Sequence, residues 1–136
     1  DGWLAKSLAV TASSGWRDVV ADRAELDDAV IVTQVDGLDY LPVGGDEEEG
    51  DRPVSLAGDQ LLGVLERLRA KYDFVVIEFP SIERRPEVAT ALRGVDAALL
   101  AVRARKTKRA AVRHTAAVVD AAAAQLVGIA LQTGRA

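Results

Sequence analysis

The sequence Ala-Ala-Leu-Leu-Ala-Val at residues 97–102 is one of three short apolar runs, with Phe-Val-Val-Ile at 74–77 and Val-Gly-Ile-Ala-Leu at 127–131. None of them alternates between apolar and polar residues, which is the pattern of parallel strands buried on both faces of a sheet. Helical patterns lie between them, one through residues 86–94 and one over 107–125. This order predicts an α/β fold with three layers, in which a mostly parallel sheet has helices on both faces.

The first half of the chain has shorter patterns. The apolar spacing predicts a helix over residues 1–11, a second helix capped by Ser14, and a further helical turn over 25–30. Residues 38–43 alternate enough to predict a strand, and residues 59–72 have the 3.6-residue spacing of an amphipathic helix.

Composition limits the class of protein. The chain has 136 residues, of which 49% are hydrophobic and 28% are charged, so we expect one soluble domain over 1–136. The absence of cysteine excludes a disulfide framework and a cysteine zinc site, and a single histidine is too few for a histidine metal site. The net charge of −4 argues against nucleic acid as a partner.

The sequence also bears on location and completeness. It has no membrane-spanning apolar run and no signal peptide pattern, so we expect a cytoplasmic protein. It begins with Asp1 and contains no methionine, which indicates a portion of a longer product. Attachment to the inner face of a membrane would then come from a partner or from a segment outside this chain.

Ligands of parallel α/β sheets bind beyond the carboxyl ends of the strands. The regions to search are therefore residues 78–85, 103–108 and 132–135. Glu78 directly follows the apolar run at 74–77, and a carboxylate in that place is typical of a nucleotide-binding protein that holds Mg²⁺. The alternative is an acid at the end of a strand that faces only solvent.

Two charged segments are candidates for an interaction surface. The basic one comprises Arg103, Arg105, Lys106, Lys108 and Arg109, and the acidic one comprises Asp46, Glu47, Glu48 and Glu49 in a loop over 46–51. Cations at the start of a helix oppose its dipole unless an anion is present, so the basic segment could receive an anion or the acidic loop of a neighbour. The alternative is a basic face that contacts only solvent.

A phosphate-binding loop of the form Gly-x-x-x-x-Gly-Lys-Ser/Thr does not occur in the sequence. Without it the phosphates of ATP have neither a cradle of backbone N–H groups nor a lysine. We therefore expect that this chain alone binds no ATP tightly.

Four stretches in order resemble one family. They are residues 37–44 (Gly-Leu-Asp-Tyr-Leu-Pro-Val-Gly), 71–80 (Lys-Tyr-Asp-Phe-Val-Val-Ile-Glu-Phe-Pro), 95–103 (Val-Asp-Ala-Ala-Leu-Leu-Ala-Val-Arg) followed by Thr107, and 127–132 (Val-Gly-Ile-Ala-Leu-Gln). Their order and spacing are similar to those of the bacterial tyrosine kinases. These are P-loop ATPase domains, related to the MinD and ParA partitioning ATPases, that regulate capsular and exopolysaccharide chain length. The resemblance covers the part of the domain that follows the nucleotide loop.

The resemblance implies roles for several residues. Glu78 stands at the family's Walker B aspartate, which implies a catalytic and Mg²⁺-binding role. Pro80 and Gln132 stand where the family contacts the nucleotide, with Gln132 in place of an asparagine near the base. The family uses ATP and Mg²⁺, and a membrane-anchored component of polysaccharide export is the implied partner, besides self-association.

The departures from the family pattern suggest a degenerate, weak or inactive relative. Glu78 is one methylene longer than the usual aspartate, and the family's tyrosine-rich tail is not present at Ala136. Two alternatives stay open beside a kinase-like ATPase of polysaccharide export. One is a non-enzymatic regulatory or interaction module on a nucleotide-binding fold, and the other is a partitioning ATPase.

Overall fold

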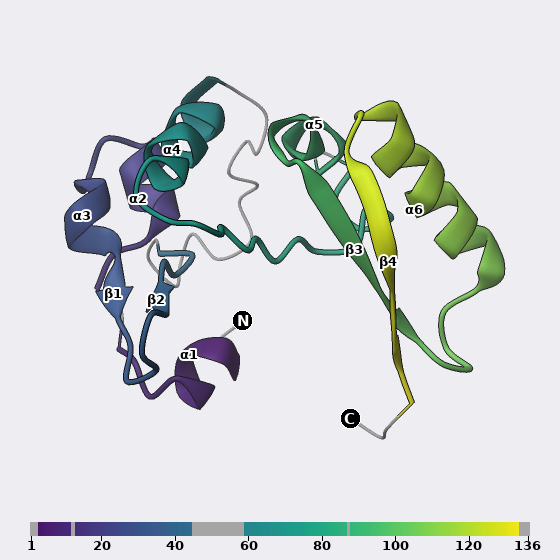
Figure 1. Ribbon diagram of the computed structural model, residues 1–136, viewed down its shortest axis with the longest axis horizontal. Helices are drawn as coiled ribbons and strands as arrows, with labels where there is room; N and C mark the ends of the chain where they lie inside the picture. Colours follow the sequence, from purple (N-terminus) through teal and green to yellow (C-terminus); the bar gives the residue numbers. More distant parts are fainter. Residues whose placement is uncertain (1–2, 12, 45–58, 87, 134–136) are drawn as a thin grey trace. The chain divides into compact units, whose positions relative to one another are not determined.

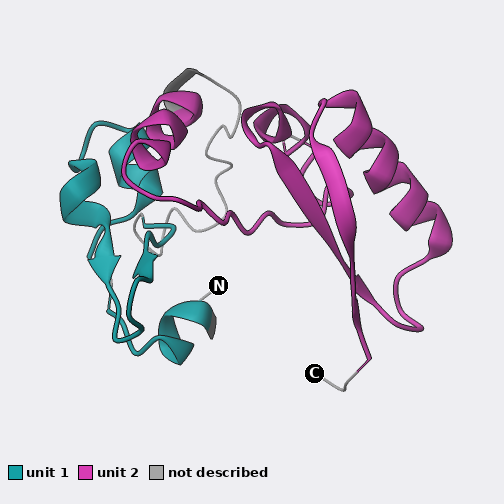
Figure 2. Cartoon of the chain, in the orientation of Figure 1, with its two compact units in different colours: residues 1–54 teal, residues 55–136 magenta. Residues whose placement is uncertain are grey.

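The computed structural model describes residues 3–11, 13–44, 59–86 and 88–133. The chain divides into two compact units, Asp1–Val54 and Ser55–Ala136 (Figure 2). Each unit is described by itself below. Whether the whole chain acts as one domain stays a prediction.

The first unit is built from short elements. They are α1 (Trp3–Ser7), α2 (Trp16–Val20), α3 (Leu26–Ala29), β1 (Ile31–Val32) and β2 (Asp39–Tyr40) (Figure 1). The two strands pair antiparallel, with Ile31 opposite Tyr40. The strand predicted over 38–43 is limited to two residues, and Pro42, which has no N–H for a strand ladder, follows soon after.

The start of α2 explains how this unit is held together. Its N-cap is Gly15, not the predicted Ser14, and the Gly15 N–H donates to Asp18 Oδ2 at 2.9 Å. The next two N–H groups, of Trp16 and Arg17, donate to the carbonyls of Pro42 and Val43 at 2.9 and 3.0 Å. These bonds satisfy the free donors at the start of the helix. Glycine is required at residue 15 because a Cβ there would collide with the backbone of residues 42–44.

The second unit contains the longer elements. They are α4 (Asp59–Arg69), α5 (Val88–Ala91), the 3₁₀ turn η2 (Leu92–Gly94), β3 (Ala97–Arg103), α6 (Arg109–Ala121) and β4 (Gln125–Gln132). Strands β3 and β4 are parallel and α6 is the crossover between them, which confirms the α/β prediction for this part of the chain. The helix that we placed near Pro86 begins at Val88, two residues later.

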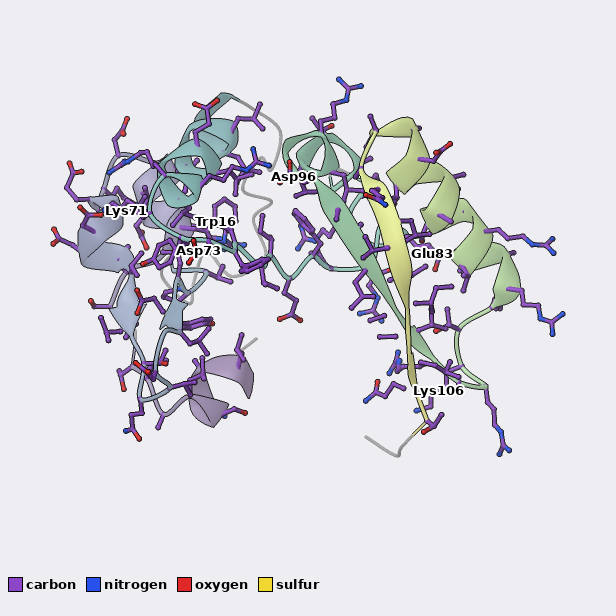
Figure 3. The ribbon with its side chains drawn as sticks, in the orientation of Figure 1. Trp16, Lys71, Asp73, Glu83, Asp96 and Lys106 are labelled. Atoms are coloured by element: carbon purple, nitrogen blue, oxygen red, sulfur yellow. The ribbon has the colours of Figure 1, made fainter. Side chains whose placement is uncertain are left out.

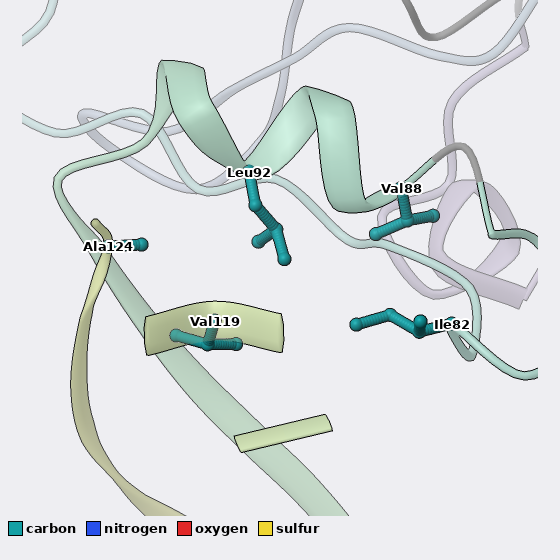
Figure 4. Packing of buried hydrophobic residues seen from close by; sticks show 5 residues of the cluster. All are labelled: Ile82, Val88, Leu92, Val119 and Ala124. Carbon is teal, nitrogen blue, oxygen red and sulfur yellow. The ribbon is translucent and has the colours of Figure 1, made fainter. Parts of the chain in front are cut away.

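One apolar cluster forms the core beside this pair of strands. Its buried members are Ile82, Val88, Leu92, Val119 and Ala124 (Figure 4). They come from the segment before α5, from α5 and η2, from α6 and from the residue before β4. The cluster therefore attaches α5 and α6 to the first half of the parallel pair, where Ala98 packs against it.

Among the described residues of this unit, nothing covers the opposite face of the pair, which differs from the prediction of strands buried on both faces. Alternate residues of β3 are half-buried, and those between them are exposed. Leu99, which lies on that opposite face, is 65% exposed. Continuous apolar sequence indicates that a strand can be buried on two sides, but α6 covers only one. The predicted three-layer arrangement stays a prediction.

The segment over 74–77 is not a strand, contrary to the prediction. Residues 74–80 are extended, and within the described ranges they pair with no strand. Phe74 is 88% exposed and Val76 is 95% exposed. A lone extended segment gains no ladder hydrogen bonds, so the apolar pattern can produce a strand here only if a neighbouring strand is supplied.

Candidate functional site

The carboxyl ends of β3 and β4 meet at a common rim. Arg103 and Gln132 are the last pair of the ladder, and the Ala104 N–H donates to the Gln132 carbonyl at 2.9 Å just beyond it. The sequence prediction that these two residues emerge side by side is confirmed. Both side chains are exposed, so they are accessible to a ligand or a partner.

A tight turn leads from β3 to α6 at this rim. The Thr107 hydroxyl accepts the Arg103 N–H at 3.1 Å, and the Thr107 N–H donates to the Arg103 carbonyl at 2.9 Å. Arg105, between them, has a φ of 61°, a left-handed conformation that is costly for a residue with a side chain. The reciprocal bonds hold the backbone of the turn that carries these cations.

The basic residues predicted from sequence gather on and beside this turn. Arg103, Arg105, Lys106, Lys108 and Arg109 are all exposed, and so is Arg113 one helical turn further on. Figure 3 shows Lys106 beyond the end of β3, whereas Asp96 lies before its start. Lys108 is the N-cap of α6 without a side-chain cap, and the first turn contains no acid. The acidic residues Asp46, Glu47, Glu48 and Glu49 lie outside the described residues.

Among the described residues, no strand carries Glu78 to the rim at the ends of β3 and β4. Because residues 74–77 pair with no described strand, the sheet does not carry Glu78 to Arg103 and Gln132, as the sequence had predicted. The Glu78 side chain is exposed and has no hydrogen-bond or ion-pair partner among the described residues. Its neighbour Phe79 packs against the core cluster, and Pro80 is exposed.

A metal role for Glu78 has little support in its surroundings. Mg²⁺ sites in nucleotide-binding proteins use one or two carboxylates together with the phosphates of the substrate. In the part of the chain that the structure describes, no three acidic or histidine side chains form a metal-binding group. Glu78 by itself does not make such a site, so the metal and nucleotide roles of Glu78, Pro80 and Gln132 stay predictions.

The other end of β3 has a polar attachment that sequence reasoning missed. Arg69, the last residue of α4, donates to the Gly94 carbonyl at 2.9 Å and to Asp96 Oδ2 at 2.8 Å. Gly94 also lies close to α4, since a Cβ there would come within 2.6 Å of Leu62 Cδ2. No motif signalled this attachment, because the two partners are 25 and 27 residues away from Arg69.

Comparison with solved structures identifies the fold. The VpsO kinase domain superposes with a TM-score of 0.84 at 21% identity, over 98% of this chain and 65% of that chain. The BceF tyrosine kinase domain gives 0.71 at 24% identity, over 86% of this chain and 48% of that chain. The chain shares the fold of these kinase domains. The chimerical protein CapA2B2 is also similar, with a TM-score of 0.78 at 17% identity, over 93% of this chain and 55% of that chain.

The similarity covers only part of each solved chain. The chain spans between 48% and 65% of the length of the three solved chains. No protein-family model matches the sequence, and no curated protein matches it either. Among the described residues, no helix has the length and apolar character to cross a membrane.

Proposed function

We propose that the chain is a tyrosine-kinase-like ATPase domain of polysaccharide biosynthesis or export that is weak or inactive in catalysis. The observation that supports the kinase-like part is the shared fold, which extends over 98% of this chain in the comparison with the VpsO kinase domain. The four motifs that resemble the bacterial tyrosine kinases are a second line of support, because they rest on residue order and spacing and not on the backbone fold.

The surroundings of the candidate catalytic residues favour weak catalysis. Glu78 is exposed and lies on an extended segment without a strand partner among the described residues. A catalytic metal requires a carboxylate that is held within a few tenths of an ångström of its working position, and a flexible exposed side chain loses entropy when it is so held. Gln132 is better placed, since the ladder with Arg103 fixes its backbone.

Titration of the chain with Mg·ATP tests this proposal. We expect a Kd no tighter than about 1 mM, which corresponds to a binding free energy of only about 4 kcal/mol, and no release of phosphate. Glu78→Gln is the test variant, and Glu83→Gln is the matched control because Glu83 is a nearby exposed acid. A micromolar Kd that Glu78→Gln weakens at least tenfold and Glu83→Gln leaves unchanged would contradict the weak-catalysis proposal.

A second candidate is a non-enzymatic interaction module on the same fold. It is favoured by the exposed cations at the rim, none of which pairs with a carboxylate among the described residues. Unpaired charges of one sign steer association with an oppositely charged partner even where they add little affinity. The chemistry of that partner is considered next.

A further inference from the structure

The charge of the chain is distributed very unevenly. Residues 1–96 contain ten basic and twenty acidic residues, whereas residues 97–136 contain seven basic residues and one acid, Asp120. The net charge of −4 therefore conceals a strongly basic last third. Six of the seven cations form the rim cluster, which we define as Arg103, Arg105, Lys106, Lys108, Arg109 and Arg113.

The rim cluster is a surface, because all six side chains are exposed at the carboxyl end of β3, on the turn and on the first part of α6. Arg105 has the left-handed φ of 61° on that turn. A residue with a Cβ is disfavoured in that conformation, where glycine is not. At position 105 the cluster therefore has an arginine in a backbone conformation that glycine would adopt at a lower conformational cost.

We propose that the rim cluster binds the anionic headgroup surface of a lipid bilayer. Clusters of four to eight lysines and arginines are the usual feature by which proteins recognise anionic lipids, each residue contributing about 1 kcal/mol. This inference rests on the second candidate function, the interaction module, and names its partner. It does not depend on any nucleotide chemistry at Glu78 or Gln132.

The residues around the cluster favour lipid over single-stranded nucleic acid. Residues 97–136 contain no phenylalanine, tyrosine or tryptophan, so the surface offers no aromatic side chain on which the bases of single-stranded nucleic acid could stack.

Cosedimentation with vesicles tests the proposal. The probes are vesicles of phosphatidylcholine alone and vesicles with about 30% phosphatidylserine, an anionic lipid. We expect the chain to bind only the second kind, and we expect binding to fall steeply between about 0.1 M and 0.5 M salt because the Debye length shortens. Equal binding to both kinds of vesicle, or no binding to either, would overturn the proposal.

Two variants test the residues. A triple variant with Arg105→Gln, Lys106→Gln and Lys108→Gln removes three cations of the cluster. It should reduce partitioning about a hundredfold, which corresponds to about 1 kcal/mol for each cation. The matched control removes three exposed cations elsewhere, with Lys6→Gln, Arg84→Gln and Arg93→Gln, and should retain most of the binding. Equal losses in the two triple variants would overturn the assignment to the cluster.

The single variant Arg105→Gly should change lipid binding and thermal stability in opposite directions. It removes one cation and the strain of the left-handed conformation together, so we expect a higher melting temperature with about fivefold weaker partitioning. If the variant binds vesicles as tightly as the parent chain does, Arg105 does not contribute to lipid binding. Saturable binding to polyglutamate, with none to anionic vesicles, would overturn the lipid assignment while leaving the interaction module intact.

Discussion

Arg103 and Gln132 are paired at the carboxyl end of the parallel ladder, and the Ala104 N–H donates to the Gln132 carbonyl just beyond them. This pairing fixes the backbone from which two chemically different side chains extend. Because α6 is the crossover between the two strands, the turn that precedes it, with Arg105 and Lys106, and the start of α6, with Lys108 and Arg109, lie at the same end. The rim therefore combines a polar amide with a cationic surface.

The contact between Gly15 and residues 42–44 should be intolerant of substitution. Gly15→Ala would place a methyl group against the backbone of Pro42 and Gly44, which cannot move aside as a flexible side chain can. We expect a loss of about 3 kcal/mol or more in the free energy of unfolding, since overpacking against backbone lies at the upper end of such effects. Chemical denaturation monitored by tryptophan fluorescence measures it.

Gly63→Ala is the matched control for that variant. Gly63 lies within α4, and a Cβ at this position meets nothing within 4 Å. An alanine in a helix interior is favoured over glycine, so the chain should become more stable by about 0.5–1 kcal/mol. Equal destabilisation by the two substitutions would contradict the close approach at Gly15.

The core of the second unit and its open face should respond differently to truncation. Leu92 is buried in the cluster with Val88 and Val119, so Leu92→Ala should cost about 2–5 kcal/mol. Leu99→Ala, on the face not covered by α6, should cost less than about 0.5 kcal/mol because its side chain is largely in solvent. A loss above 2 kcal/mol at Leu99 would show that this face is covered in solution.

The two bonds of Arg69 should contribute unequally. Asp96 has a side chain that is 90% exposed, so Asp96→Ala should reduce stability by no more than about 0.5 kcal/mol. Arg69→Ala should cost more, because it also removes the donor of the part-buried Gly94 carbonyl, whose loss is worth about 1 kcal/mol. The reverse ranking in thermal unfolding would indicate that the ion pair, and not the carbonyl bond, attaches α4 to β3.

The sequence predicted strands correctly where an apolar run also has a neighbouring strand with which it can pair. The apolar runs at 97–102 and 127–131 predict strands β3 and β4, and the spacing over 107–125 predicts the helix that contains α6. Parallel order places Arg103 and Gln132 at the same edge, whereas the register that pairs them comes from the structure. The run at 74–77 has the same composition but no described partner, and composition alone cannot distinguish a strand from a segment that lacks its neighbours. Pattern likewise predicted burial on both faces, although a run such as Leu99-Leu100 becomes buried only where another layer exists.

The sequence predicted which residues belong to the candidate site, but not how those residues are arranged in space. The basic segment and Gln132 were selected because they follow strands, and both lie at the rim. The left-handed turn at Arg105 was not signalled by any glycine, and the bond from the Arg103 N–H to Thr107 joins residues four apart that no helix or strand pattern connects. The role of Glu78 could not be judged from sequence, because it depends on what lies beside residues 74–77.

The parallel register of β3 and β4 is the claim on which the rim and its cluster depend, and disulfide trapping tests it directly. Ala101 and Ala130 are ladder partners and are both exposed, and the chain has no native cysteine. Neighbouring strands lie about 4.8 Å apart, within the reach of a disulfide, so the pair Ala101→Cys and Ala130→Cys should oxidise rapidly to one intramolecular bond.

The control for this measurement is the pair Ala97→Cys and Ala130→Cys. Ala97 is the partner of Gln125, five residues from Ala130 along β4, and at about 3.3 Å per residue the two thiols are too far apart to join. The account predicts an intramolecular disulfide in the first pair and none in the control pair under the same oxidant. A disulfide in the control pair with none between residues 101 and 130 would contradict it.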